Sequence, residues 1–178
     1  MAYPTYRLPF DASIHPVTIT QGRNGPWSHL KYDRRDASNA VDFGLPVGSD
    51  VFAARSGRVI SPYFHTSDSY YDGTDPEIGR NFPGLMTNMT VVLHKDGTRA
   101  FYIHLAKGGI HVALNQHVSE GDRIATTGLS GWVGSHPHLH FEVQSGGGTY
   151  LSLPVTFKDY RGPLEHDEIY PPHLGKER

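Results

Sequence analysis

The residue types best suited to chemistry in this sequence are imidazoles and carboxylates, because the chain has 12 His and no Cys. Any metal ion must therefore be bound through nitrogen and oxygen rather than through thiolates. The strongest local pattern is the segment His138-Leu139-His140-Phe141-Glu142-Val143. In a strand, side chains point alternately to opposite faces, so His138, His140 and Glu142 would share one face. The imidazoles could then converge on one metal ion or one substrate group, although two surface histidines would give the same pattern.

The segment Ala40-Val41-Asp42-Phe43 repeats this arrangement with a carboxylate. Apolar Val41 and Phe43 would occupy one face of a strand, so Asp42 would project from the other face. Taken alone, Asp42 could equally be a turn residue. Beside the paired histidines, it supplies an acidic group that faces the same site.

A third segment, Phe101-Tyr102-Ile103-His104-Leu105, adds another imidazole. Alternation predicts that Phe101, Ile103 and Leu105 form the core side and that Tyr102 and His104 lie on the opposite face. His104 alone could be a hydrogen-bonded core histidine. Its occurrence together with the other two segments indicates a site rather than three unrelated polar residues.

The elements that must position these residues read as strands. From residue 44 onward, short alternating runs are separated by Gly, Asn, Asp and Pro, and they cover residues 50–60, 90–94, 100–105, 123–127 and 138–143. Since no long pattern of helical period occurs, we expect an all-β fold of mostly antiparallel sheets, with little helix outside the N-terminal third and the tail. Lys95-Asp96-Gly97-Thr98 is predicted to form a hairpin turn, because Asp-Gly accepts positive φ.

The length of 178 residues fits one domain, 1–178, with a core at about 17–157 and a C-terminal tail at 158–178 that wraps the surface. Residues 48–54 resemble residues 121–127, which indicates either a duplicated β-hairpin unit or the common need for Gly at tight turns. Residues 61–89 predict a long surface loop, either a substrate-lining loop or a solvated insertion. We expect the site in an open groove between this loop and residues 129–137.

Charge and hydropathy exclude several partners. A formal net charge of -2 gives no basic footprint for nucleic acid. No apolar run approaches the roughly 20 residues that a membrane span needs, and the N-terminus lacks the pattern of a signal peptide. We therefore expect a protein without a membrane span, and we expect it to be a monomer.

These segments resemble the lysostaphin-like zinc endopeptidases of peptidoglycan, whose fold is called the duplicated hybrid motif. The resemblance runs from about residue 17 to residue 157. Besides the segments quoted above, it rests on Ser28-His29, on residues 44–48 and 51–59, on Asp96-Gly97-Thr98 and on the stretch 121–128. The block from Pro137 to Val143 is its most specific part, and the glycine positions support it.

The resemblance implies one zinc ion per chain, bound by His29, Asp42 and His140, with His104 and His138 as unligated catalytic histidines. Two nitrogens and one carboxylate leave a fourth tetrahedral position for water. Either unligated histidine could accept a proton or hydrogen bond to the oxyanion. The substrate-binding residues stay unassigned.

The spacing of the first ligand departs from the commonest form of this family. That form has a His four residues before the Asp, and Ser38 occupies this position here. A variant has the His further upstream after a Ser, as Ser28-His29 does, and no other His lies between His29 and Asp42. The remaining histidines are expected to be surface or turn residues: His15, His65, His94, His111, His117, His136, His166 and His173.

The resemblance implies a zinc metalloendopeptidase that cuts stem or cross-bridge peptides of bacterial cell-wall peptidoglycan, acting outside the cytoplasm as an extracellular, periplasmic or phage-delivered protein. The alternative is an inactive relative that binds cell wall or a wall-cutting partner. Two His and one carboxylate would also fit a non-haem iron oxygenase. A lipoyl- or biotinyl-type carrier is least favoured, because neither expected hairpin tip carries a lysine.

Overall fold

The protein, for which we analysed a computed structural model, is described here at residues 4–32, 35–63, 87–131, 133, 136–146 and 151–165. These residues form strands, turns and loops and contain no helix, as the sequence predicts. Nothing in them could therefore serve as a membrane-crossing helix. In chain order the strands are β1 (Thr5–Tyr6), β2 (Ile19–Gln21), β3 (Lys31–Tyr32), β4 (Arg35–Asp36), β5 (Val41–Gly44), β6 (Asp50–Phe52), β7 (Gly57–Tyr63), β8 (Met89–Leu93), β9 (Arg99–Ile103), β10 (Leu105–Ile110), β11 (His117–Val118), β12 (Arg123–Thr127), β13 (His138–Gln144) and β14 (Thr156–Phe157).

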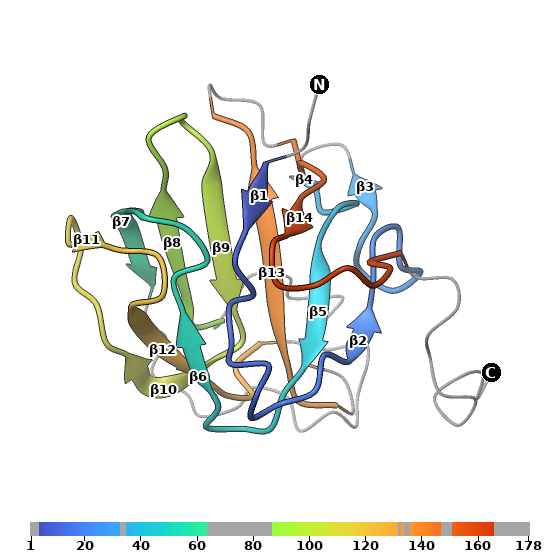
Figure 1. The fold of residues 1–178 in the computed structure, drawn as a ribbon, viewed down its shortest axis with the longest axis horizontal. Coiled ribbons are helices and arrows are strands. Elements are labelled where there is room, and N and C mark those ends of the chain that lie inside the picture. Colours follow the sequence, from blue (N-terminus) through green and yellow to red (C-terminus); the bar gives the residue numbers. More distant parts are fainter. Residues whose placement is uncertain are drawn as a thin grey trace.

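One sheet of seven strands dominates the fold, in the order β11-β7-β8-β9-β13-β5-β2. Every neighbouring pair in it is antiparallel. A three-stranded antiparallel sheet, β10-β12-β6, and two pairs, β1-β14 and β3-β4, complete the described strands. Figure 1 shows β1 and β14 in front of β13. The prediction of an all-β, mostly antiparallel fold is therefore confirmed.

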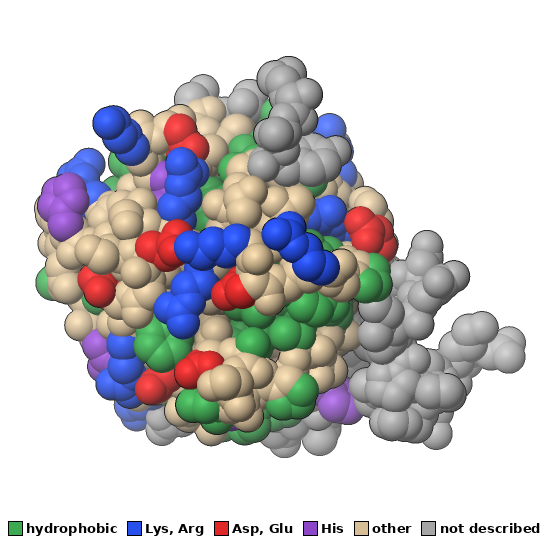
Figure 2. Space-filling model, in the orientation of Figure 1, with side chains coloured by type: hydrophobic (Ala, Val, Ile, Leu, Met, Phe, Trp, Pro, Cys, Tyr) green, Lys and Arg blue, Asp and Glu red, His purple; other side chains and the backbone are tan. Residues whose placement is uncertain are grey.

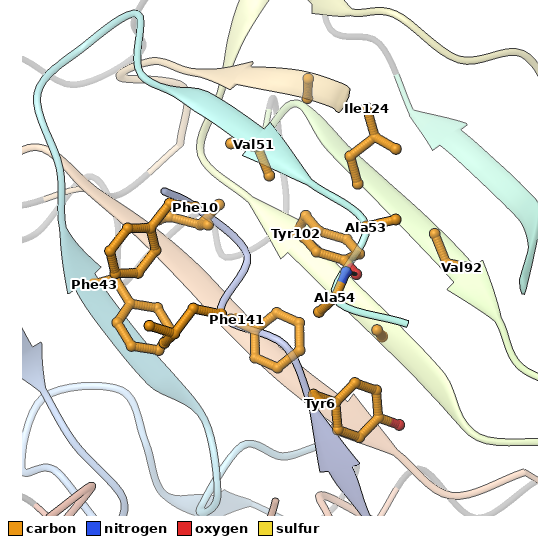
Figure 3. Packing of buried hydrophobic residues seen from close by; sticks show 14 of the residues in the cluster. Tyr6, Phe10, Phe43, Val51, Ala53, Ala54, Val92, Tyr102, Ile124 and Phe141 are labelled. Carbon is orange, nitrogen blue, oxygen red and sulfur yellow. Dashed lines mark hydrogen bonds between the residues drawn. The ribbon is translucent and has the colours of Figure 1, made fainter. Parts of the chain in front are cut away.

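The hydrophobic core lies between one face of the seven-stranded sheet and the segments in front of it. Tyr6 of the N-terminal segment packs edge-on against Phe141 of β13, with ring centroids 6.0 Å apart. Phe10 packs against Phe43 of β5 at 5.2 Å, and Figure 3 shows these rings side by side. Phe157 of β14 contacts both Phe43 and Phe141. The apolar faces of β5 and β13 are therefore the core faces, as alternation predicts.

The predicted faces of Phe101, Tyr102 and Ile103 are wrong, whereas Leu105 belongs to the core as predicted. Tyr102 pairs with Phe141 across β9 and β13, so it lies on the core face, where its ring is fully buried. The Tyr102 hydroxyl accepts a hydrogen bond from the Ala54 N–H at 2.8 Å, which satisfies its polar atom inside the core. Phe101 and Ile103 pair with Glu142 and His140 instead and lie on the site face. Alternation failed because both faces of β9 carry large side chains.

Two local predictions have clear outcomes. The predicted hairpin turn joins β8 to β9: Gly97 has φ 84°, and the His94 N–H donates to the Thr98 carbonyl at 2.8 Å. The predicted run 50–60 is interrupted, because β6 ends at Phe52 and β7 begins at Gly57 in a different sheet.

The two similar stretches of sequence lie against each other. Residues 50–52 of the first form β6, and residues 123–127 of the second form β12, and these strands pair antiparallel. Val51 and Ile124 both belong to the core cluster. The predicted loop 61–89 begins within β7, and its residues 64–86 lie outside the described part of the chain.

Charged side chains of both signs are mixed on the face that carries β1 and β6 (Figure 2). Arg55 pairs with Asp96 at 2.6 Å, and Arg123 pairs with Asp50 at 2.6 Å.

Candidate metal centre

The opposite face of the seven-stranded sheet brings two of the predicted ligands together. Asp42 on β5 pairs directly with His140 on β13. Directly opposite residues on antiparallel strands share a face, so both side chains project away from the core. The His140 Nδ1 atom lies 2.9 Å from Asp42 Oδ1. Both side chains are buried.

His29 reaches the same point from the loop between β2 and β3. Its Nε2 atom lies 3.2 Å from Asp42 Oδ1 and 3.3 Å from His140 Nδ1. The His29 ring is fully buried, and its Nδ1 atom lies 2.8 Å from the Gly22 carbonyl oxygen. Ser38, at the position of the commoner ligand spacing, is instead bound to Asp36 through its N–H and hydroxyl.

The three side chains fit a metal ion by geometry and by chemistry. Their candidate ligand atoms all lie within 4.8 Å of one another. A carbonyl oxygen only accepts, so the Gly22 carbonyl requires the proton of His29 on Nδ1 and leaves a lone pair on Nε2. Two imidazole nitrogens and one carboxylate are a common zinc set that leaves a position open. The residues present therefore fit zinc.

The second nitrogen of His140 faces a further carboxylate. Its Nε2 atom lies 3.8 Å from Glu142 Oε2, two residues along the same face of β13. The Gln144 amide donates to Glu142 Oε1 at 2.7 Å, and all three side chains are buried. A carboxylate behind a ligating imidazole orients the ring and favours a proton on the distant nitrogen. That proton would leave Nδ1 of His140 available as a ligand.

His138 and His104 stand beside this group. The His138 Nε2 atom lies 3.7 Å from Asp42 Oδ2, and its Nδ1 donates to the His136 carbonyl at 2.8 Å. His104 Nδ1 donates to the Ser130 carbonyl at 2.8 Å. The rings of His104 and His138 meet edge-on with centroids 4.7 Å apart. Each ring therefore has its proton on Nδ1 and a lone pair on Nε2.

His104 reaches the site through an unusual backbone conformation. β9 ends at Ile103, and alternation alone would send the next side chain to the core face, with Tyr102. His104 has φ 68°, in the left-handed region, and this turn carries its ring to the site face. The His104 carbonyl accepts the Gly128 N–H at 2.8 Å, which holds the turn against β12. The sequence therefore predicted the correct face for His104, but the side chain reaches it through this turn and not through regular alternation.

The protonation of Asp42 and His140 depends on their burial and on the charges of the neighbouring side chains. Burial raises the pKa of Asp42, but the nearby imidazoles of His29, His138 and His140 outweigh it and hold this pKa well below its usual range. Burial lowers the pKa of His140, but the Asp42 charge and hydrogen bonds to Asp42 and Glu142 raise it to about 9. A proton on His140 thus occupies the centre when no metal is bound.

The two neighbouring histidines behave in the opposite way. Burial, followed by the charges of His138 and His140, shifts the pKa of His104 well below its usual value. Burial also lowers the pKa of His138, although the Asp42 charge opposes the shift. Both rings are therefore neutral at neutral pH and able to accept a proton at Nε2.

Sequence reasoning missed Gln21, which contacts the centre directly. Its amide donates to Asp42 Oδ2 at 3.0 Å, and the side chain is only 4% exposed. A single Gln carries no metal-ligand signal, and alternation would place it with Ile19 in the core. The nearby glycines Gly22 and Gly25 are a weak sequence signal, because glycine is common where the backbone passes close to other atoms.

The other histidines mostly lie away from this group. His111, His117 and His136 are exposed and His15 is partly exposed, while His65, His166 and His173 lie outside the described residues. His94 is a turn residue, since its carbonyl accepts the Gly97 N–H at 3.0 Å, but its side chain is buried, with Nδ1 3.0 Å from the Ser56 carbonyl and the ring packed on Tyr6. His136 contributes its carbonyl to His138.

Of the two segments predicted to flank the site, only the one at 129–137 lies mostly within the described residues. Ser130 and His136, from the segment 129–137, supply the carbonyls that orient His104 and His138. The other predicted wall, at residues 61–89, lies mostly outside the described residues.

Comparisons with known proteins identify peptidases similar to this chain. The chain is 32% identical over 137 residues to the peptidoglycan DD-endopeptidase ShyB of Vibrio cholerae, a match covering 77% of this chain and 27% of ShyB. The chain therefore spans about a quarter of that relative. A zinc-containing peptidase from Vibrio cholerae is 27% identical with a TM-score of 0.51, over 80% of this chain and 36% of that one.

The lysostaphin catalytic domain of Staphylococcus simulans has the same fold. Its TM-score is 0.54 at 22% identity, over 81% of this chain and 92% of that domain. The expected lysostaphin-like fold is thus confirmed.

The family match covers most of the site. Residues 36–151 match peptidase family M23, a zinc-dependent metallopeptidase family. This range contains Asp42, His104, His138 and His140, whereas His29 precedes it and is joined to the group by the geometry described above. The chain belongs to peptidase family M23.

Proposed function

We propose that this chain is a zinc-dependent endopeptidase that hydrolyses peptide bonds in bacterial cell-wall peptidoglycan. The observation that carries the proposal is the convergence of His29 Nε2, Asp42 Oδ1 and His140 Nδ1 on one buried point. The inactive alternative predicts lost ligands, whereas His29, Asp42 and His140 lie together in a group that could hold a metal ion. Family membership also favours zinc over the iron site and the carrier considered from the sequence.

In this proposal His29, Asp42 and His140 bind one zinc ion per chain. Zinc in such a site acts as a Lewis acid that polarises the scissile carbonyl and acidifies a water molecule. Two of the three ligands, Asp42 and His140, come from the paired strands β5 and β13, and His29 comes from the loop before β3, where its Nδ1 lies 2.8 Å from the Gly22 carbonyl oxygen.

His104 and His138 move protons in the proposed reaction. Each has its Nδ1 proton tied to a carbonyl and a lone pair on Nε2, so each can take a proton from the attacking water. Once protonated, the same nitrogen can hydrogen bond to the oxyanion or return the proton to the leaving amine. Their lowered pKa values keep these rings ready to accept a proton near neutral pH.

The substrate class is supported by the relatives. ShyB and a second Vibrio cholerae relative, ShyA, are both named peptidoglycan DD-endopeptidases. We assign this chain the same substrate, stem or cross-bridge peptides, and hence a place of action outside the cytoplasm. A chain spanning a quarter of ShyB would contain the hydrolytic part of such a protein.

The direct test is digestion of purified peptidoglycan, with the released muropeptides identified by mass spectrometry. We expect cleavage at peptide bonds, loss of activity with a chelator, and recovery on addition of zinc. His140→Ala should abolish cleavage, because it removes one ligand.

His111→Ala is the matched control, since His111 is exposed and absent from the metal cluster. It should retain wild-type activity. A folded, zinc-loaded protein that cleaves no peptidoglycan of any cross-link type would refute the proposal.

A further inference from the structure

We propose that Gln21 is the positioning residue of this metal centre and that it joins the Asp42 carboxylate to the segment carrying His29. The inference rests on the proposed ligand set. The first proposed ligand, His29, comes from the loop between β2 and β3, and this loop must be held near Asp42 on β5. Gln21 is not proposed to touch the metal or the substrate.

The hydrogen bonds of Gln21 run in two directions. Its Nε2 donates to Asp42 Oδ2 at 3.0 Å and to Ser28 Oγ at 2.8 Å. Its Oε1 accepts the N–H groups of Trp27 and Ser28 at 3.0 and 3.1 Å. One carboxamide therefore holds the two residues before His29 and also the carboxylate that His29 must meet.

This arrangement leaves the ligand oxygen of Asp42 free of the amide. Gln21 binds Oδ2, whereas His29 and His140 approach Oδ1. A donor fixed on Oδ2 sets the rotation of the carboxylate, so Oδ1 points to the centre. Partners of this kind behind a ligand commonly govern metal affinity.

A β-bulge turns Gln21 toward the site. Ile19 pairs with Phe43, on the core face, whereas Gln21 pairs with Asp42, on the site face, and the register shifts between them. Residues two apart on a regular strand share a face, so without the shift Gln21 would enter the core. Bulges are used in this way to redirect a side chain next to a site.

The loop leaves space for the Gln21 side chain. A Cβ on Gly25 would overlap Cγ of Gln21 and come within 2.9 Å of its Oε1. Position 25 therefore tolerates only Gly while the amide stays in place. The bulge and this glycine are independent structural features that both accommodate Gln21.

The test compares the zinc affinity of the wild-type full chain with that of its variants, measured by competition with a chromogenic chelator. Gln21→Met keeps the length of the side chain but removes both hydrogen-bonding groups. We expect its zinc Kd to rise about 10- to 100-fold. In the zinc-free variant, hydrogen exchange of the Trp27 and Ser28 amides should also accelerate, because both lose their acceptor.

Asn39→Leu is the matched control. The Asn39 amide ties the segment between His29 and Asp42 to the Ser152 carbonyl at 3.0 Å, without contact to either ligand. The Asn39→Leu variant should have lower thermal stability than the wild type and an unchanged zinc Kd. A purely structural role for Gln21 would give Gln21→Met the same result, and that result would overturn the inference.

A second variant tests the inference without altering Gln21. Gly25→Ala should displace the amide and raise the zinc Kd in the same direction, which covers the case in which Gln21→Met fails to fold. Unchanged zinc affinity in folded Gly25→Ala would count against the inference. Failure of the proposed function looks different, because a zinc-loaded wild-type chain would then cleave no peptidoglycan, whereas the inference is tested by zinc affinity alone. Failure of the ligand set would appear as a wild-type chain that binds no zinc.

Discussion

At the scale of single residues, the centre depends on which nitrogen of each histidine carries a proton. Backbone carbonyls of Gly22, Ser130 and His136 set this for three rings by accepting their Nδ1 protons. His140 differs, because its Nδ1 faces Asp42 and its Nε2 faces Glu142. It is the ring whose proton must leave before all three ligand atoms can bind a cation.

Zinc affinity should therefore depend on pH through His140. Its pKa is raised to about 9, so the zinc-free centre holds this proton at neutral pH and zinc must displace it. Affinity should rise about tenfold per unit between about pH 6 and 8 and level off above about pH 9. Calorimetry in buffers of different ionisation enthalpy should detect about one proton released per zinc.

A pH-independent affinity over this range would contradict the assigned proton. The sign is fixed by linkage: the raised pKa favours the protonated zinc-free state at low pH, and so zinc binds more weakly there.

At the scale of elements, the site depends on places where strands break their regular pattern. The left-handed turn at His104 and the bulge before Gln21 each bring a side chain to the site face. Gly128 supports the first of these, because its N–H donates to the His104 carbonyl and a Cβ there would overlap the backbone of Ala106.

Gly128→Ala should therefore reduce catalysis more than zinc binding. The clash displaces the start of β10 and with it His104, whereas the three proposed ligands lie on other segments. A displacement of about 1 Å at a reacting group can cost about 100-fold in rate. We expect kcat to fall by about that factor with the zinc Kd unchanged, measured by muropeptide release and chelator competition.

Gly108→Ala, on β10, is the control. A Cβ at Gly108 meets no atom within 4 Å, although its φ of 65° makes the substitution strained. It should lower stability slightly and leave kcat near that of the wild type. Equal kcat values for the two variants would show that Gly128 does not position His104.

The regular strands were the predictable part of the site. Alternation correctly placed Asp42, His138 and His140 on one face, because β5 and β13 each have a clear apolar face. It failed for β9, where Phe101 and Tyr102 both suit a buried face. Turns and bulges depend on tertiary contacts, so the route of His104 and the role of Gln21 could not be read from periodicity.

The assignment of His29 as a ligand rested on the resemblance to a known family and not on a pattern of spacing. A loop residue has no periodicity, and its position depends on contacts with Gly22 and Gln21 that are local only in the folded chain. The paired strand β3-β4 occupies the long interval between His29 and Asp42.

At the scale of the whole molecule, the core and the site use opposite faces of the same strands. Phe141 lies between His140 and Glu142 on β13, is fully buried and contacts Tyr6, Tyr102 and Phe157. The rigidity of the centre therefore depends on packing on the far side of the sheet.

Phe141→Ala should destabilise the fold by about 3–5 kcal/mol, because it removes a large buried ring and leaves a cavity. Chemical denaturation of the zinc-free protein measures this without a contribution from the metal. Leu114→Ala, at a side chain 57% exposed, should change stability by less than about 0.5 kcal/mol. Equal costs for the two variants would be inconsistent with the observed core.

The most direct test of the metal centre is a crystal structure of the zinc-loaded chain with an anomalous difference map at the zinc absorption edge. We predict one site per chain, with His29 Nε2, an Asp42 oxygen and His140 Nδ1 each within about 2.0–2.2 Å of the ion. A zinc ion bound elsewhere, or bound at Asp42 and His140 with His29 turned away, would contradict it.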